Sequence, residues 1–348
     1  MSASTASATA RLAYIDALRG FAIVLVVIGH ALQYGIPEPD NNPLFRFIYA
    51  FHMPLFMFVS GFVYSGFGRT ITAELRLKSL SLLVPFIAWL PVTLLWTELG
   101  PTPIGAGRFL ANVIASPDAG GLWFLWVLFL INVIVLAGRT ITPRSPLAAA
   151  WAMWAILNVV ALIRPQSNIL GLKLLCWHLP FFLTGISLRR TRLASQLNWA
   201  LALVSSLTFL VLSAFWVRAG TSPLAVHLAA LPSMVQFASL RVFNYAVAFS
   251  GILAAFSVFA AICKARLLPW LDRLGRVSLE IYATHIYFLA LTVALVAMWD
   301  VPETVRVATI FGGGLAGALL ASAAIKKWPP LAVVMFGARN RPTLGVAG

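Results

Sequence analysis

The chain has 348 residues, of which 61% are hydrophobic and only 10% charged, and its mean hydropathy is +0.91. A water-soluble protein of this length needs far more charge to cover its surface, so the composition excludes a soluble globular domain. The formal net charge of +15 would suit a protein that binds nucleic acid. The basic residues, however, stand in short clusters between apolar segments, which indicates contact with membrane lipids and no nucleic-acid partner.

Apolar segments recur along the whole chain, and several approach the ~20 residues that a helix needs to cross a bilayer. Ten are expected, at 15–35, 47–67, 80–98, 121–138, 147–163, 172–188, 197–217, 241–262, 277–299 and 304–325. The sequence therefore predicts an all-α integral membrane protein with about ten transmembrane helices. We expect a disordered Ser/Thr/Ala stretch at 1–10, one polytopic membrane domain at 11–336 and a flexible basic tail at 337–348.

The distribution of Lys and Arg between the loops predicts the orientation of the chain. If the N-terminus is cytoplasmic, the outer side carries only seven of these residues and the other 18 of the 25 lie inside. The outer seven are Arg46, Arg108, Arg164, Lys173, Arg218, Arg241 and Arg306. By the positive-inside rule we expect both termini in the cytoplasm.

The first apolar segment carries an acid and a base at its entrance and a histidine within it, in the run DALRGFAIVLVVIGH from Asp16 to His30. Arg19 and His30 are eleven positions apart, which is about 20° past three full helical turns, so both side chains lie on one face. They are separated by ~16 Å along the axis, about half the thickness of the hydrocarbon core. If Arg19 marks the inner surface, His30 lies near the midplane.

Four of the five histidines, His30, His52, His178 and His285, lie in or beside apolar segments. Ionisable groups in a membrane are costly and usually face a bundle interior or a wet cavity, so each is a functional candidate. The alternative for any one of them is a neutral imidazole that is hydrogen-bonded to a neighbouring helix. His30 is the strongest candidate because Asp16 and Arg19 share its helix.

Three further segments contain polar or aromatic groups in apolar surroundings. In FHMPLFMFVSGF, Pro54 is expected to bend the helix beside His52, and Ser60 with Gly61 offers a hydroxyl at a close-packing position or simply packs helices. In SLEIYATHIYFL, Tyr282 and His285 can share a face, whereas Glu280 points to a different one. Trp123 lies at an expected outer interface, either in an aromatic belt or as a platform for substrate.

These segments carry a resemblance to a known family. The opening YIDALRG with its R-x10-H spacing, together with FHMPLFMFVSGF, GLWFLWVLFLIN, LPFFLTGISL and SLEIYATHIYFL, resembles the membrane proteins of acyltransferase family 3 in both order and spacing. This family includes the fucose 4-O-acetylase-like enzymes and bacterial acetylases of O-antigen, exopolysaccharide and Nod factor. The resemblance implies about ten spanning helices and acylation of a sugar hydroxyl from an acyl-CoA, usually acetyl-CoA.

The resemblance also implies roles for individual positions: an essential arginine and histidine, a second-helix motif, a fourth-helix aromatic pair and a late histidine. In this chain they are Arg19 with His30, His52 with Ser60 and Gly61, Trp123 with Phe124, and His285. Before the proline of its third helix the family usually has a paired basic motif. This chain keeps Arg76 and Lys78 there but has Ser81 in place of the base nearest Pro85.

Transfer of an acyl group from a thioester to a hydroxyl needs a base, for which imidazole is suited at neutral pH, and donors for the oxyanion. We expect catalysis by His30, Arg19, His52 and Asp16, and contacts to the substrate or the oxyanion by Ser60, Trp123, His285 and Glu280. Arg19, Arg76 and Lys78 are expected at the cytoplasmic face, where cations can bind the phosphates of acetyl-CoA. No metal is expected. We favour direct deprotonation of the sugar hydroxyl by His30. A covalent mechanism, in which His30 first becomes an acyl-imidazole, remains an alternative.

The sequence thus predicts an acetyl-CoA-dependent O-acetyltransferase of the bacterial inner membrane. Its acceptor would be a polysaccharide or a lipid-linked saccharide precursor, and its partners would include membrane lipids. Two other classes remain open. A transporter or flippase of glycan intermediates would show repeated halves, which we do not find, and a non-catalytic subunit of a polysaccharide assembly complex would not need Arg19, His30 and His285 together.

Overall fold

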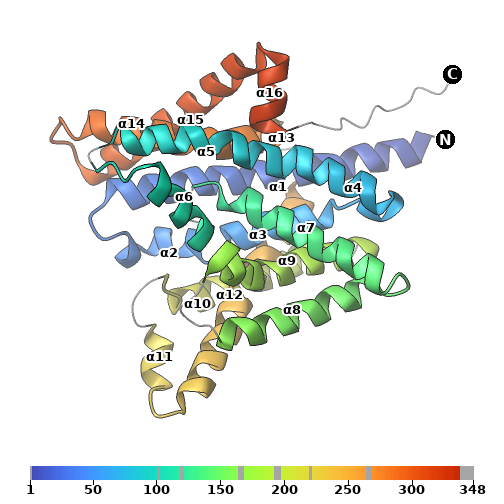
Figure 1. Ribbon diagram of the computed structural model, residues 1–348. Coiled ribbons are helices and arrows are strands. Elements are labelled where there is room, and N and C mark those ends of the chain that lie inside the picture. The colour runs from blue at the N-terminus through green and yellow to red at the C-terminus, as the bar shows by residue number, and fades with distance from the viewer. Residues whose placement is uncertain are drawn as a thin grey trace. The chain divides into compact units, whose positions relative to one another are not determined.

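The computed structural model describes residues 2–100, 102–117, 121–163, 168–191, 197–218, 222–263 and 269–337, and within these ranges it contains helices and no strand (Figure 1). The predicted all-α class is confirmed. The predicted tail at 337–348 lies, apart from Gly337, outside the described residues.

Nine helical stretches within the described residues are long and apolar enough to cross a bilayer. They are Tyr14–Gly35, Pro43–Gly68, Ile71–Glu98, Trp123–Ile141, Pro146–Ile163, Ile169–Arg189, Ser233–Ile262, Ser278–Val296 and Glu303–Lys326. The segment expected at 197–217 is the shorter helix α10 (Trp199–Ala214). With 16 residues it is ~24 Å long, less than the ~30 Å of a hydrocarbon core.

The chain forms two compact units. The first contains residues 1–64 and 184–321. Its helices are α1 (Ser2–Gly35), α2 (Pro43–Tyr49), α3 (His52–Phe62), α10, α11 (Pro223–His227), α12 (Ser233–Cys263), α13 (Pro269–Arg276), α14 (Ser278–Val296) and most of α15 (Glu303–Lys326). Within this unit α1 is central, because it packs against α2, α3, α12, α13 and α14 (Figure 1).

The second unit contains residues 65–183 and 322–348. Its helices are α4 (Ile71–Lys78), α5 (Val84–Glu98), α6 (Ala106–Ala115), α7 (Trp123–Ile141), α8 (Pro146–Ile163), the first part of α9 (Leu172–Arg190) and α16 (Pro329–Phe336). Within it α7 packs against α4, α5 and α8, and α16 packs against α5. The indole N–H of Trp89 fixes α16 by donating to the carbonyl of Met335 at 2.8 Å.

Helix α1 begins at Ser2, and the disorder expected for 1–10 stays a prediction. One predicted segment needs correction. The second segment is not bent at Pro54 but is broken before His52, where Ala50 and Phe51 separate α2 from α3. Pro54 lies in the first turn of α3, where a missing N–H removes no intrahelical hydrogen bond.

The third predicted segment begins earlier than expected, since α4 continues into α5 through a π-helical turn, Ser79–Leu83. Pro85 has no N–H to bond the carbonyl of Ser81, and the N–H of Val84 instead bonds Ser79 across five residues. Arg76 and Lys78 therefore lie on a helix and not on a loop. Gly337 lies beside Ser81 and has a φ of +81°. A Cβ at this position would lie 2.7 Å from the Ser81 carbonyl oxygen, so both the backbone conformation and the space favour glycine at position 337.

Candidate active site

Two histidines from distant parts of the chain meet in the first unit. The ring of His30 on α1 and the ring of His285 on α14 have their centroids 5.4 Å apart. The packing of α1 against α14 brings them together. The structure thus joins the first-helix histidine and the late histidine into one imidazole pair.

The ring of His30 is held by two partners that the sequence analysis did not identify. The carboxamide oxygen of Gln33 lies 3.2 Å from His30 Nδ1 and accepts a 2.6 Å hydrogen bond from the hydroxyl of Tyr49, which is itself 3.3 Å from Nδ1. Because an amide oxygen only accepts, Nδ1 carries the proton and Nε2 has the lone pair. His30 therefore offers a base at Nε2, in a ring that is partly accessible.

The ring of His285 is fixed by the backbone of its own helix. Its Nδ1 donates to the carbonyl oxygens of Ile281 at 3.0 Å and Tyr282 at 2.9 Å, and the side chain is 3% exposed. Carbonyl oxygens only accept, so here too the proton is on Nδ1 and the lone pair on Nε2. That Nε2 is buried and has no hydrogen-bond partner among the described residues.

His52 adjoins this pair through Tyr49. Its Nδ1 donates to the carbonyl oxygen of Ile48 at 2.8 Å, and its ring lies edge-on to Tyr49 with centroids 4.9 Å apart. Ser60 lies eight positions further along α3, which is ~12 Å along the axis. His52 therefore belongs to the histidine cluster, whereas Ser60 is separated from it, and the predicted oxyanion role of Ser60 stays a prediction.

Glu280 is also buried, at 1% exposure, five positions before His285 on α14. Five positions are about 500° of helical rotation, or 140° beyond one full turn, so Glu280 faces another direction. Tyr282, in contrast, has its ring centroid 6.1 Å from that of His285. The tyrosine shares the environment of the histidine pair, as the spacing predicts.

One end of the cluster is covered by an ion pair between two loops that we expected on the outer side. Arg218 donates to both carboxylate oxygens of Asp40, at 3.0 and 2.9 Å, and its guanidinium lies 4.9 Å from the Phe45 ring and 5.3 Å from the Tyr49 ring. The hydrogen bond to Asp40 raises the pKa of Arg218 above its usual value. Arg218 thus remains charged and packs against the ring of Tyr49.

The other end of α1 carries the predicted Asp16 and Arg19. Their side chains form a loose ion pair, 3.5 Å from Nη1 to Oδ1, and both are partly exposed. Since α1 is continuous, Arg19 lies ~16 Å from His30 along the axis, as expected. Arg19 therefore does not touch the histidine pair, and the geometry leaves it a role at the end of the helix.

Helix α13 crosses α1 at this end with its backbone in direct contact. A Cβ on Gly20 would lie 2.0 Å from the carbonyl oxygen of Leu271, and one on Gly275 would lie 1.8 Å from that of Asp16. The crossing also brings Asp272 near Asp16. Burial, together with the charge of Asp16, raises the pKa of Asp272 above its usual range, against the opposing effect of Arg276.

In the second unit, Trp123 lies against a different histidine. Its ring centroid is 5.1 Å from that of His178, which is 3% exposed and whose Nδ1 donates to the carbonyl oxygen of Leu174 at 2.8 Å. This contact favours an interior role for Trp123 over an aromatic belt. The predicted substrate contact of Trp123 stays a prediction.

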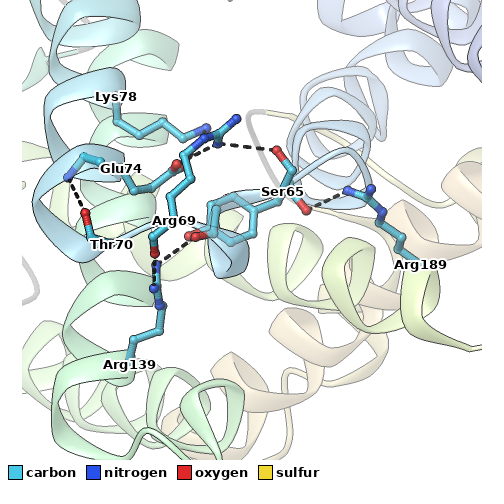
Figure 2. Close-up of polar contacts among 10 residues, drawn as sticks. Ser65, Arg69, Thr70, Glu74, Lys78, Arg139 and Arg189 are labelled. Atoms are coloured by element: carbon cyan, nitrogen blue, oxygen red, sulfur yellow. Dashed lines mark hydrogen bonds and ion pairs between the residues drawn. The ribbon is translucent and has the colours of Figure 1, made fainter. Parts of the chain in front are cut away.

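Figure 2 shows the polar contacts around Lys78 in the second unit. Glu74 is fully buried and pairs with Arg69 at 2.8 Å and with Lys78 at 3.6 Å. Arg139 donates to the carbonyl oxygens of Gly66 at 2.9 Å and Arg69 at 2.6 Å. Two cations, Arg69 and Lys78, therefore pair with one carboxylate, and Arg139 binds the backbone beside Arg69. Arg76 is exposed. Sequence reasoning missed Arg69 and Arg139, because nothing in their spacing links them to Lys78.

No group of three or more His, Cys, Asp or Glu side chains in the described ranges is placed to hold a metal ion. The groups available for chemistry are the imidazoles of the first unit, the basic cluster of the second unit and the partly exposed Arg19. This set offers bases within an apolar interior and cations near helix ends. Within the first unit the imidazoles suit proton transfer, and Arg19 and the basic cluster of the second unit each suit the binding of an anionic group.

Comparison with known proteins agrees with this reading. Residues 12–326 match the acyltransferase family 3 pattern, described as "Acyltransferase domain". The nodulation protein NolL of Sinorhizobium fredii is 27% identical over 88% of this chain and 86% of its own length. NolL of Mesorhizobium japonicum is 32% identical over 49% of this chain, a match that spans 46% of the relative's own length. No solved structure matches. The chain belongs to acyltransferase family 3 and is a multi-pass membrane acyltransferase.

Proposed function

We propose that this protein transfers an acetyl group from acetyl-CoA to a hydroxyl of a sugar in a polysaccharide or its lipid-linked precursor, in the inner membrane of a bacterium. The observation that carries the proposal is the state of His30. Its Nδ1 is held by Gln33 and Tyr49, which leaves the lone pair on Nε2 of a partly accessible ring. A neutral imidazole with a fixed tautomer is the base that attack by an alcohol requires.

In the proposed reaction, His30 Nε2 takes the proton of the sugar hydroxyl as the oxygen attacks the thioester carbonyl. The new C–O bond forms, the C–S bond breaks, and the CoA thiolate takes the proton. The negative charge on the carbonyl oxygen needs a donor. His52 adjoins His30 through their common neighbour Tyr49, but the Ile48 carbonyl already accepts from its Nδ1–H, so His52 could donate to the oxyanion only when Nε2 is also protonated.

Cations at the predicted inner surface would bind the phosphates of the donor. Arg19 suits this role because it is partly exposed and its ion pair with Asp16 is loose. Arg76 is exposed, and Lys78 pairs with the buried Glu74, which also binds Arg69. Arg19 is proposed to hold the donor while its thioester reaches His30, and Arg76 and Lys78 keep their predicted role as contacts to phosphate.

The experiment measures transfer of radiolabelled acetyl from acetyl-CoA to surface polysaccharide in membranes that contain each variant. We expect His30→Ala to abolish transfer while the protein still inserts in the membrane, and Arg19→Ala to raise the KM for acetyl-CoA about tenfold. His227→Ala, at an exposed histidine outside the cluster, is the matched control. Transfer by His30→Ala within a few-fold of wild type would remove His30 as the base.

The product is identified by comparing the O-acetyl NMR signals of surface polysaccharide from a deletion strain and its parent. Loss of one signal in the deletion strain supports the proposed acceptor class. An unchanged spectrum, together with no acceptor-dependent release of free CoA by the membranes, would contradict the proposed function.

A further inference from the structure

The reaction described above uses His30 alone as the base, yet the structure holds a second imidazole beside it. His285 is 3% exposed, and its Nε2 is a buried polar atom without a hydrogen-bond partner among the described residues. Leaving such an atom unsatisfied is unfavourable, because it loses its hydrogen bonds to water and gains none in the protein. A group that remains buried and unpaired in this way calls for a proton or a donor that arrives during function.

The state of the His285 ring follows from its geometry. Two main-chain carbonyls, those of Ile281 and Tyr282, accept from Nδ1, so the proton is on Nδ1 and cannot move to Nε2 without losing both bonds. The lone pair on Nε2 is therefore a permanent feature of the neutral ring. Since α14 holds the ring by its own backbone, no other side chain is needed to orient it.

The position of His285 identifies its partner. Its ring centroid lies 5.4 Å from that of His30, whose Nδ1 is likewise occupied and whose Nε2 is the proposed base. When His30 Nε2 takes a proton, the His30 ring gains a donor, and the neighbouring His285 ring carries an unpaired acceptor. We propose that His285 is a positioning residue that binds, through its Nε2, the proton which His30 takes from the acceptor hydroxyl.

This inference rests on the proposed function and adds one step to it. The proton leaves the sugar oxygen for His30 Nε2 and is then shared between the Nε2 atoms of the two imidazoles as one N–H···N hydrogen bond. As the C–S bond breaks, the proton goes to the CoA thiolate, and both rings return to their neutral state. Shared in this way, a single positive charge is stabilised in an apolar interior that disfavours it on one ring.

The first test does not depend on activity. In detergent-solubilised protein labelled with 15N-histidine, the resonances that disappear in His285→Gln identify the ring nitrogens of His285. We expect one protonated and one unprotonated ring nitrogen. The couplings between the ring nitrogens and the ring protons are expected to assign the protonated nitrogen as Nδ1. A His285 ring protonated at Nε2 would overturn the inference, whatever the outcome for the proposed function.

The second test is chemical rescue. We expect His285→Gly to lower kcat by about 100-fold and to change the KM for acetyl-CoA by less than about twofold, because His285 acts on proton transfer and not on donor binding. Added imidazole is expected to enter the space left by the ring and to raise the kcat of His285→Gly about tenfold or more. His178→Gly, which removes another buried ring anchored through Nδ1 to a carbonyl, is the matched control and should show no rescue.

The outcomes separate the two proposals. Suppose that the wild-type protein transfers acetyl. If His285→Gly then keeps full kcat, or loses kcat without rescue by imidazole, the role of His285 is overturned and the proposed function stays in place. Wild-type protein that transfers no acetyl overturns the proposed function, and the role of His285 falls with it. Rescue of His285→Gly but not of His178→Gly supports the inference.

Discussion

The hydroxyl of Tyr49 donates a 2.6 Å hydrogen bond to the carboxamide oxygen of Gln33, the same oxygen that lies 3.2 Å from His30 Nδ1. A residue at the end of α2 thereby fixes which nitrogen of a histidine on α1 carries the proton. We expect Tyr49→Phe to lower kcat about tenfold, because one hydrogen bond of about 1.4 kcal/mol no longer orients Gln33. The measurement is acetyl transfer at saturating acetyl-CoA.

Tyr34→Phe is the matched control for this change. Tyr34 also has its ring near His30, with centroids 6.3 Å apart, but is 44% exposed and is not part of the hydrogen bonds around Gln33. Its variant should keep kcat within about twofold of wild type, since an exposed hydroxyl contributes little. Equal losses in the two variants would contradict the role given to Tyr49.

The crossing of α1 and α13 should not tolerate a methyl group. Gly275→Ala would place a Cβ 1.8 Å from the carbonyl oxygen of Asp16, so two backbones must separate. We expect a loss of stability above about 3 kcal/mol, visible as a much lower Tm and less monodisperse protein in size-exclusion chromatography. Gly312→Ala, at a helical glycine with no atom within 4 Å, is the control and should keep the wild-type Tm.

The raised pKa of Asp272 predicts a stability that depends on pH. Folding favours the protonated carboxyl, so this group adds stability at low pH and loses it as the pH rises through the interval between its ordinary and its raised pKa. We therefore expect Asp272→Asn to have a higher Tm than wild type at pH 7.5, with the difference shrinking as the pH falls toward about 4. A difference that grows on acidification would contradict the sign of the shift.

The buried carboxylate of the second unit predicts a large effect of neutralising it. Glu74→Gln leaves Arg69 and Lys78 without their common anion (Figure 2). Because these two side chains are 37% and 23% exposed, the cost is smaller than the ~3–5 kcal/mol of breaking a fully buried ion pair. We expect a markedly lower Tm in thermal unfolding. Glu303→Gln, at an exposed position, serves as the control and should change the Tm by no more than a degree or two, since exposed charges contribute about 0–1 kcal/mol.

Much of the fold could be predicted from the sequence, because hydropathy decides which segments cross a membrane. Nine of the expected segments are long apolar helices, and the shorter α10 is the tenth. The boundaries were less predictable: the break before His52 and the π-helical turn before Pro85 depend on where backbone hydrogen bonds are lost, which hydropathy does not report. The family was recognisable from motifs that the comparison confirms.

The candidate site was predicted only in its members and not in their arrangement. His30 and His285 were chosen because a titratable ring in an apolar segment is costly. That the two rings meet is a tertiary fact, set by the packing of α1 on α14. Gln33 and Tyr49 were missed because an uncharged amide or phenol near the end of a segment does not carry the cost of an ionisable group in a membrane. Each nevertheless lies three positions from a predicted histidine, Gln33 from His30 and Tyr49 from His52.

The short helix α13 has a further consequence. It follows α12, leads directly into α14, and touches α1 through Gly20 and Gly275. The helices that bear His30 and His285 are thus coupled at one end by eight residues outside the spanning segments. This coupling supports the packing of α1 on α14 that brings the two rings together, so a substitution in α13 is expected to alter the activity without altering any group that meets the substrates.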